Sequence, residues 1–135
     1  MKILALETST EFCSVALFLN GRIFNREVLA GHRHSEILLS MIQEILSEAE
    51  LTLQQIDGIA FGAGPGSFTG LRIACGVAQG LAYAANLPVV GISTLEAVAQ
   101  KIGEQKIIVA LDARMGEIYH AAYQKVTNHD WKAIS

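Results

Sequence analysis

The sequence predicts an α/β fold built on a mixed sheet. The chain opens with short apolar runs, and two of them flank Asn20-Gly21, a strong hairpin signal. From Ser35 the spacing of apolar residues becomes helical, and helical segments then alternate with short apolar runs. Three strands followed by alternating helices and strands are typical of an α/β domain with a mixed sheet, in which some strands pair parallel and others antiparallel.

The individual elements follow from this pattern. We expect strands over 2–6, 14–19 and 22–28, a helix over about 35–49, and a strand over 56–61. A long helix then runs from about Ser67, a plausible N-cap, to Ala85. A short buried strand over 87–92 follows, and Ser93-Thr94 begins a helix that extends to about Lys101.

The end of the chain looks like the start of a second unit. Strands are expected over 106–111 and 117–125, joined by a turn over 112–116. We therefore divide the chain into an N-terminal lobe, 1–104, and an incomplete second lobe, 105–135. The tail 126–135 has no stop signal and no obvious partner strand, so either it docks on the first lobe or the chain is a fragment, which we favour.

Composition excludes several classes of protein. The chain has 135 residues, 51% of them hydrophobic and 17% charged, which fits a globular domain with surplus apolar surface. A net charge of −3 gives no basic footprint for independent binding of nucleic acid. The first apolar run is too short for a signal peptide or a membrane span. Cys13 and Cys75 form no metal or disulfide motif, so we expect a cytoplasmic protein with reduced cysteines.

A glycine-rich segment over 61–72 joins the predicted strand 56–61 to the long helix. No Lys-Ser or Lys-Thr follows its glycines, so it is no Walker motif, and its spacing is not G-x-G-x-x-G. Two interpretations stay open. The favoured one is a tight strand-to-helix turn, and the other is an anion site at the helix start, to which Arg72 would contribute.

Candidate catalytic groups are few. Ser67 is not part of a G-x-S-x-G motif, so serine catalysis is not indicated. His32 and His34 form an H-x-H pair without a nearby third ligand, and we expect both to be solvated. We therefore predict no catalytic residue, no metal and no cofactor.

The surplus apolar surface points to a subunit interface. The helix over 67–85 is apolar around nearly its whole circumference, and the helix over 35–49 has an apolar arc wider than one contact requires. Gly76 and Gly80 would let another helix approach closely. The interface we predict contains Ile37, Met41, Ile45, Ile73, Gly76, Val77, Gly80 and Ala84. The alternative is that a missing second lobe covers these helices.

Three segments resemble the TsaB (YeaZ) family of bacterial proteins over essentially the whole chain. They are Gly64-Pro65-Gly66-Ser67-Phe68-Thr69-Gly70-Leu71-Arg72, Ile3-Leu4-Ala5-Leu6-Glu7-Thr8-Ser9-Thr10 and Gly91-Ile92-Ser93-Thr94-Leu95. The resemblance implies the actin-like, ribonuclease H-like fold of sugar kinases. The first lobe would then be a mixed five-stranded sheet flanked by helices, facing a second lobe of related topology.

The resemblance also implies where a nucleotide could bind. In that fold the first hairpin often carries an acidic residue followed by Gly, Thr or Ser, which bind a nucleotide phosphate. The corresponding segment here, Glu7-Thr8-Ser9-Thr10, keeps an acid and hydroxyls but lacks the glycine that brings the backbone close to the phosphate. The anion or nucleotide contacts to be tested are Glu7, Thr8, Ser9, Gly64, Gly66, Ser67, Thr69 and Arg72. The catalytic relative TsaD holds a metal with two histidines, and this chain has Thr94 and Val98 at those places, so the metal site looks lost.

The function implied is that of a non-catalytic scaffold in tRNA modification. Similarity to TsaB implies that the chain pairs with itself or with TsaD and works with the ATPase TsaE. TsaD then transfers the threonylcarbamoyl group to tRNA adenosine beside the anticodon. The chain would reach tRNA only through that complex and would not contact a membrane. The alternatives are a small-molecule kinase or ATPase of the same fold and a degenerate metallopeptidase-like protein.

Overall fold

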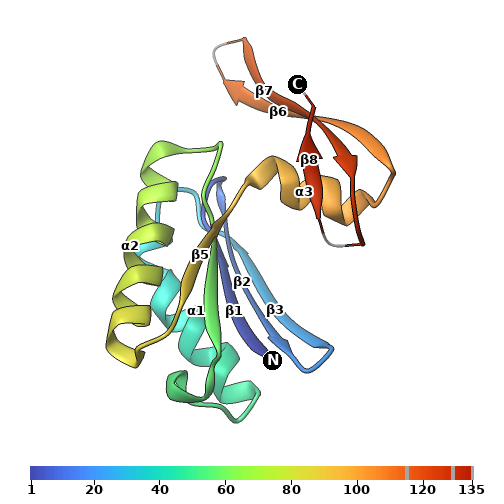
Figure 1. The fold of residues 1–135 in the computed structure, drawn as a ribbon. Coiled ribbons are helices and arrows are strands. Elements are labelled where there is room, and N and C mark those ends of the chain that lie inside the picture. Colours follow the sequence, from blue (N-terminus) through green and yellow to red (C-terminus); the bar gives the residue numbers. More distant parts are fainter. Residues whose placement is uncertain (115, 129, 135) are drawn as a thin grey trace.

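The protein contains two β-sheets and three α-helices, shown in a computed structural model (Figure 1) that describes residues 1–114, 116–128 and 130–134, without the side chains of Asp112 and Arg114. The larger sheet has the strand order β3-β2-β1-β4-β5. Its strands are β1 (Lys2–Glu7), β2 (Phe12–Leu19), β3 (Arg22–Leu29), β4 (Gly58–Gly62) and β5 (Val89–Ile92). The mixed five-stranded sheet flanked by helices that the sequence predicts is thus confirmed.

The first hairpin forms where the sequence predicts it. Asn20 and Gly21 both have positive φ, 49° and 89°, and Leu19 pairs with Arg22 across the two-residue turn. β1 pairs antiparallel with β2 and parallel with β4, and β4 pairs parallel with β5. β2 begins at Phe12, two residues before the predicted start.

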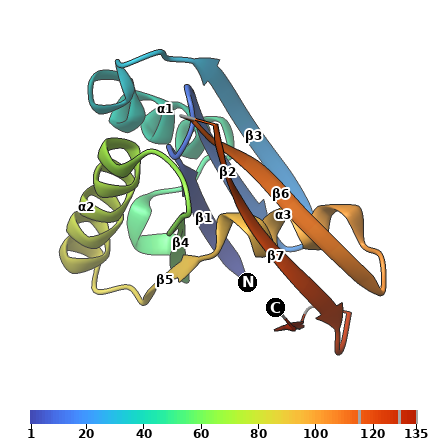
Figure 2. The same ribbon diagram turned by 90° about the horizontal axis from the view of Figure 1, so that it is seen from above.

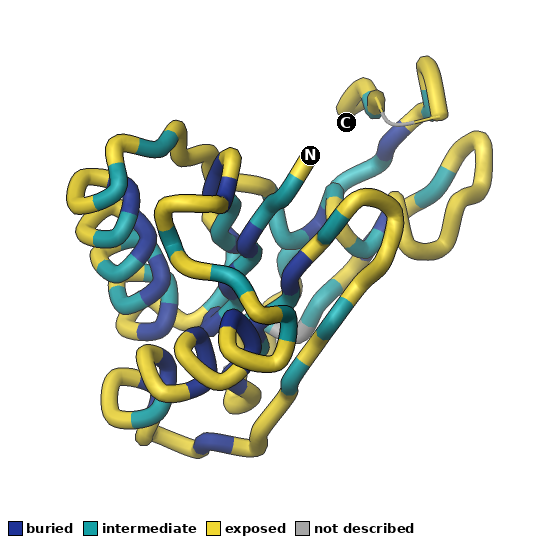
Figure 3. The backbone as a smooth tube through the Cα atoms, turned by 90° about the horizontal axis from the view of Figure 1, so that it is seen from below, coloured by how far each residue is buried: buried dark blue, intermediate teal, exposed yellow. Residues whose placement is uncertain are grey.

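Both long helices cover one face of this sheet (Figures 1 and 2). They are α1 (His34–Glu48), followed by the 3-10 turn η1 (Leu53–Gln55), and α2 (Phe68–Ala85). α2 presents Ala74, Ala78 and Ala82 to the sheet at four-residue spacing, and all three are buried. Figure 3 shows the same one-sided burial along the helices. The core between the layers also contains Leu4, Leu6, Val15, Leu17, Leu38, Ile45 and Ile59.

The ends of α2 follow the predicted chemistry. The Ser67 hydroxyl accepts a hydrogen bond from the Gly70 amide at 3.3 Å, which confirms Ser67 as the N-cap. Asn86 closes the helix in the left-handed conformation, with φ of 55°.

One histidine differs from its prediction. His32 is exposed, but His34 is only 6% exposed, and its Nε2 donates to the carbonyl oxygen of Thr10 at 2.7 Å. The expectation that His34 is solvated is therefore wrong. Its ring instead ties the start of α1 to the loop between β1 and β2, a contact between residues far apart in sequence.

A second hydrophobic cluster lies beyond the first sheet. It joins α3 (Thr94–Ile102) to a sheet of β6 (Lys106–Arg114), β7 (Glu117–Lys125) and β8 (Trp131–Ala133). Leu95 and Ala99 of α3 are buried there with Val109 and Tyr123. In Figures 1 and 2, this unit lies on the opposite side of the large sheet from α1 and α2.

The tail finds its partner within this second cluster. β8 pairs antiparallel with β7, and the Trp131 indole donates to Gln100 of α3 at 2.6 Å. Residues before β5 pack in the first hydrophobic cluster, and residues from Leu95 onward pack in the second. The division of the chain into lobes at 104/105 stays a prediction. No helix among the described residues is long and apolar enough to cross a membrane.

Candidate functional site

The glycine-rich loop between β4 and α2 is held between two other segments. The Ser67 amide donates to the Ser9 carbonyl oxygen at 2.8 Å, which fastens the loop to the β1–β2 connection. On the other side, the Thr94 amide donates to the Gly64 carbonyl oxygen at 2.9 Å. Gly64 has φ of 96°, and its peptide bond to Pro65 is cis. The loop is therefore a fixed junction of three chain segments.

Three glycines are required at this junction by close approach. A Cβ on Gly66 would lie 2.5 Å from the Ser9 Cβ. A Cβ on Gly70 would overlap the Thr8 carbonyl oxygen, and one on Gly62 would overlap the Glu7 carboxylate. These glycines thus let the loop and the first turn of α2 pack directly against the segment Glu7–Ser9.

The polar groups of the junction mostly bind one another. The buried Thr8 hydroxyl donates to the Gly70 carbonyl oxygen at 2.5 Å, and the Ser9 amide donates to the Glu7 Oε1 at 2.8 Å. Ser67 is engaged through both its amide and its hydroxyl. Within the described part of the chain, the Ser9 hydroxyl is buried without a partner. The Ser67 and Gly70 amides are thus already used within the junction.

The structure brings together six of the eight predicted anion contacts. Glu7, Thr8, Ser9, Gly64, Gly66 and Ser67 meet at the junction, on the contacts given above. Thr69 and Arg72 lie exposed on α2, where the Arg72 guanidinium sits 5.4 Å above the Phe68 ring. Stacking on Phe68 gives Arg72 a structural partner of its own. These contacts give the glycines and Arg72 structural roles, and both interpretations of the loop stay predictions.

Among the described residues, no group of three or more His, Cys, Asp or Glu side chains is placed so that it could hold a metal ion. Thr94 begins α3, and its buried hydroxyl has no hydrogen-bond partner within the described ranges. Val98 packs against the second hydrophobic cluster.

The predicted subunit interface divides into a buried and an exposed set. Met41 and Ile45 are 4% and 0% exposed, so both belong to the core of the chain itself. Ile37, Ile73 and Val77 are half-buried against that core. Gly76, Gly80 and Ala84 are exposed, and a Cβ built on either glycine would meet no atom within 4 Å. The expectation that Met41 and Ile45 are free to contact a partner is wrong, because both face the sheet.

Two features of the surface escaped the sequence reasoning. Phe68 and Tyr83, 72% and 92% exposed, stand near opposite ends of α2, and Leu39 of α1 is 52% exposed. On the sheet face away from α1 and α2, a pocket of about 400 Å³ lies between the strands and α3. Small side chains at alternate positions of β1, β2 and β4 were the signal for that pocket.

Comparison with known proteins agrees with this architecture. A family model described as TsaD, tRNA N6-adenosine threonylcarbamoyltransferase, matches residues 27–134. The chain is 47% identical to the tRNA threonylcarbamoyladenosine biosynthesis protein TsaB of Escherichia coli K12, over 97% of this chain and 58% of that protein. It is 50% identical to TsaB of Haemophilus influenzae, over 88% of this chain and 52% of that protein.

A solved structure gives the same result in three dimensions. YeaZ from Pseudomonas aeruginosa superimposes with a TM-score of 0.89 at 43% identity, covering 99% of this chain and 64% of that one. The chain therefore spans less than two-thirds of the length of each of these relatives. The match to the family model and the likeness to these relatives together show that the chain belongs to the TsaD family and is a homologue of the TsaB (YeaZ) proteins.

Proposed function

We propose that the chain is a non-catalytic subunit in the biosynthesis of threonylcarbamoyladenosine in tRNA. It pairs through the outer side of α2 with the threonylcarbamoyltransferase TsaD, works with the ATPase TsaE, and forms a homodimer when alone. The observation that carries the proposal is the exposed, small-residue side of α2, formed by Gly76, Gly80 and Ala84. The biosynthetic role for which the TsaB relatives are named supports the pathway.

The outer side of α2 suits a helix of another subunit. Open space surrounds Gly76 and Gly80, so a second helix could approach the α2 backbone closely. Half-buried Ile73 and Val77 border these glycines, and exposed Tyr83 offers a large apolar ring with a hydroxyl. Aromatic side chains of this kind are enriched among the residues that dominate interface energies.

The glycine loop supports a role without catalysis. Its glycines pack closely on Thr8 and Ser9, and Arg72 stacks on Phe68, so these residues have structural roles that need no phosphate. With a net charge of −3, the chain reaches tRNA only through the complex, which we place in the cytoplasm.

Gly80→Leu tests the pairing directly. A leucine at this exposed helical position improves helix propensity by about 1 kcal/mol, so the fold is retained while the close approach is blocked. We expect sedimentation to show at least about tenfold weaker association, alone and with TsaD. The control is Gln79→Leu, the same new side chain at the adjacent exposed position. Equal association of both variants with TsaD would sink the interface proposal.

One observation favours a second function, a small-molecule kinase or ATPase. The Glu7 carboxylate is held by the Ser9 amide at the carboxyl end of β1, beside the parallel strand β4. Ligands of open α/β sheets bind outside the carboxyl ends of such strands. Isothermal titration with Mg-ATP separates the two functions. Micromolar binding by the chain alone supports the kinase, and its absence supports the scaffold.

A further inference from the structure

β3 forms an outer edge of the large sheet. The strand order ends at β3, so among the described residues no strand pairs with its outer side. The Ala30 amide donates to the carbonyl oxygen of Glu11 at 2.9 Å, which continues the pairing of β2 with β3. Hydrogen-bonded pairs alternate along an antiparallel ladder, so every second residue of β3 bonds β2 and the others direct their backbone groups outward. The outward groups belong to Ile23, Asn25, Glu27 and Leu29.

Exposed apolar side chains lie beside this free edge. Ile23 and Leu29 are 66% and 62% exposed. Their partners on β2 are Phe18 and Phe12, 40% and 38% exposed. Directly opposite residues point to the same face, so each pair makes an apolar patch that reaches the edge, on the sheet face away from α1. A strand edge that carries such patches is a template for a strand of another chain.

The sequence of β3 is complementary to itself when two copies run antiparallel. With Arg26 on a two-fold axis, Ile23 of one copy lies opposite Leu29 of the other. Asn25 then lies opposite Glu27, whose carboxylate can accept a hydrogen bond from the Asn25 side-chain amide. The outward backbone groups of the two strands meet in hydrogen-bonded pairs, and the apolar patches of the two copies join into two continuous rows.

Other registers of the two strands lack this match. A shift by two residues in one direction places Glu27 opposite Glu27, and like charges directly opposite are destabilising. A shift by two residues in the other direction places Ile23 opposite Glu27. A shift by one residue brings outward backbone groups against groups that already bond β2. The register with Arg26 on the axis is therefore the favoured one.

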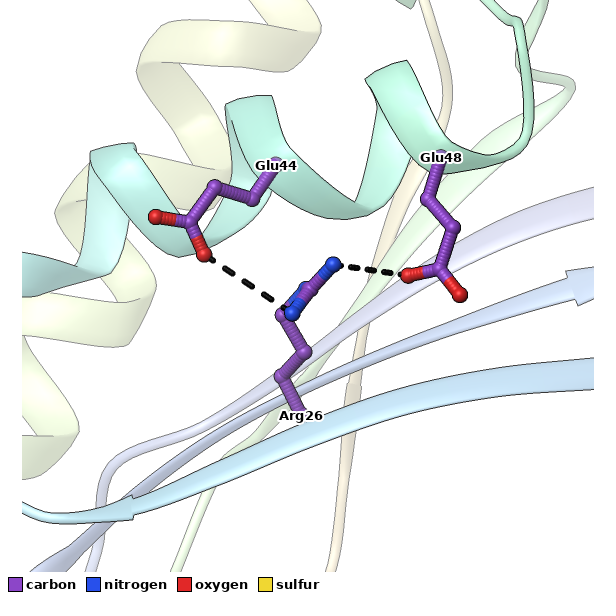
Figure 4. A network of polar contacts seen from close by, with 3 residues as sticks. All are labelled: Arg26, Glu44 and Glu48. Atoms are coloured by element: carbon purple, nitrogen blue, oxygen red, sulfur yellow. Dashed lines mark hydrogen bonds and ion pairs between the residues drawn. The ribbon is translucent and has the colours of Figure 1, made fainter.

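The helix side of the sheet leaves room for this pairing. The Arg26 guanidinium is bound to Glu48 at 2.7 Å and lies 3.9 Å from Glu44, so two Arg26 side chains at the axis would each be neutralised within their own chain (Figure 4). α1 packs on β2, and the β2 strands of the two copies would be three strand spacings apart, about 14 Å. Packed helices need only about 8–10 Å between their axes, so the two α1 helices do not collide.

We propose that a second copy of this chain pairs antiparallel with β3, so that the two large sheets join into one continuous sheet across a two-fold axis. Main-chain hydrogen bonds hold the two strands together, and the contacts of Ile23 with Leu29 set their register. This surface is separate from the α2 interface proposed above, because α2 packs on β4 and β5, at the other end of the strand order. Both surfaces can be occupied at once, and each is tested by its own variants.

Disulfide formation between two single-cysteine variants tests the register. In a Cys75→Ser background, Ile23→Cys is mixed with Leu29→Cys. Hydrogen-bonded antiparallel partners have Cα atoms about 5.5 Å apart, which a disulfide spans, whereas two copies of either position would lie about 20 Å apart. We expect oxidation to link the mixture at least about tenfold more than either variant alone. The control mixture of Ile23→Cys with Glu27→Cys, two residues out of register, should stay at the level of the single variants.

Sedimentation at high concentration measures the association itself. Gly80→Leu removes pairing through α2 and should leave a dimer held by β3. Asn25→Pro removes a backbone N–H that points outward, so no hydrogen bond to β2 is lost, and proline occurs on edge strands in this orientation. We expect Asn25→Pro in the Gly80→Leu chain to weaken the dimer at least about tenfold, and the matched Asn25→Ala to leave it within about twofold.

Each of three results would overturn the proposal. The first is a mixture of Ile23→Cys and Leu29→Cys that forms no more disulfide than either variant alone. The second is a Gly80→Leu chain that sediments as a monomer at every concentration, and the third is a Gly80→Leu dimer that Asn25→Pro leaves unchanged. Buried Cys13 reports folding, since it stays unreactive to iodoacetamide only in a folded chain. If Asn25→Pro fails this check, the two cysteine mixtures decide.

Discussion

At the scale of single residues, the glycine loop is defined by what its glycines touch. The motif over 61–72 could be found by reading the sequence, and so could the N-cap at Ser67. Its packing partner could not, because Thr8 and Gly70 are 62 residues apart in the chain. Sequence spacing shows that a glycine is present but not which distant backbone lies against it. The burial of His34 and of Met41 could not be predicted for the same reason.

The two glycine environments of α2 predict opposite effects of alanine. Gly70→Ala should destabilise the chain by about 3 kcal/mol or more, because the new methyl group would overlap the Thr8 backbone. Gly76→Ala should stabilise it by about 1 kcal/mol, because this helical position is open. Urea denaturation measures both. A Gly70→Ala variant as stable as the parent would refute the close packing of this junction.

Cys13 should make part of the stability depend on pH. Burial raises the pKa of the Cys13 thiol above its ordinary value of 9.0, so the unfolded chain loses this proton first. The protonated Cys13 thiol therefore contributes fully to the free energy of unfolding below about pH 9, and this contribution is lost as the pH rises above that value. Cys13→Ala should therefore destabilise less at about pH 10 than at about pH 8 in urea denaturation.

A neighbouring substitution controls for other effects of high pH. Val15→Ala removes methyl groups from the same buried side of β2 and changes no titratable group. Its destabilisation should be the same at both pH values. If Cys13→Ala behaves like Val15→Ala, the raised pKa is refuted.

At the scale of elements, sequence patterns predicted the three α-helices of the described residues and the strands of the large sheet, with ends shifted by a few residues. Capping and turn residues explain this success, since Asn20-Gly21, Ser67 and Ser93 mark boundaries locally. The expectation that the strand over 87–92 is buried is wrong, because β5 is an edge strand and all four of its residues are exposed. β8 is different: it has three residues and depends on pairing with β7 and on the contact of Trp131 with α3. Short strands of this kind are set by tertiary contacts, which periodicity does not contain.

An ion-pair network links two of these elements (Figure 4). Arg26 of β3 binds Glu48 of α1 at 2.7 Å and lies 3.9 Å from Glu44. Because these groups are partly exposed, we expect Glu48→Gln to cost only about 0.2–1 kcal/mol and Glu44→Gln less. Denaturation at low and high salt should show the Glu48→Gln effect shrinking as salt rises. A larger effect of Glu44→Gln would contradict this geometry.

At the scale of the whole molecule, the large sheet carries two different surfaces. The helices on one side offer the exposed glycines Gly76 and Gly80 of α2, and the other side carries the pocket of about 400 Å³ that Ala5, Ala16 and Ala60 help to line. The fold and family could be predicted because long motifs specify them. The division of apolar residues between core and surface could not, because both kinds share one helical periodicity, as Met41 and Gly80 illustrate.

The most direct test is the transfer reaction itself. Threonylcarbamoyladenosine formation on tRNA is measured with TsaD and TsaE, with and without this chain. We predict no product from the chain alone, stimulation of TsaD by the chain, retained stimulation with Gln79→Leu, and loss of at least about tenfold with Gly80→Leu. Product formed by the chain alone, or equal stimulation by Gly80→Leu, would contradict the account.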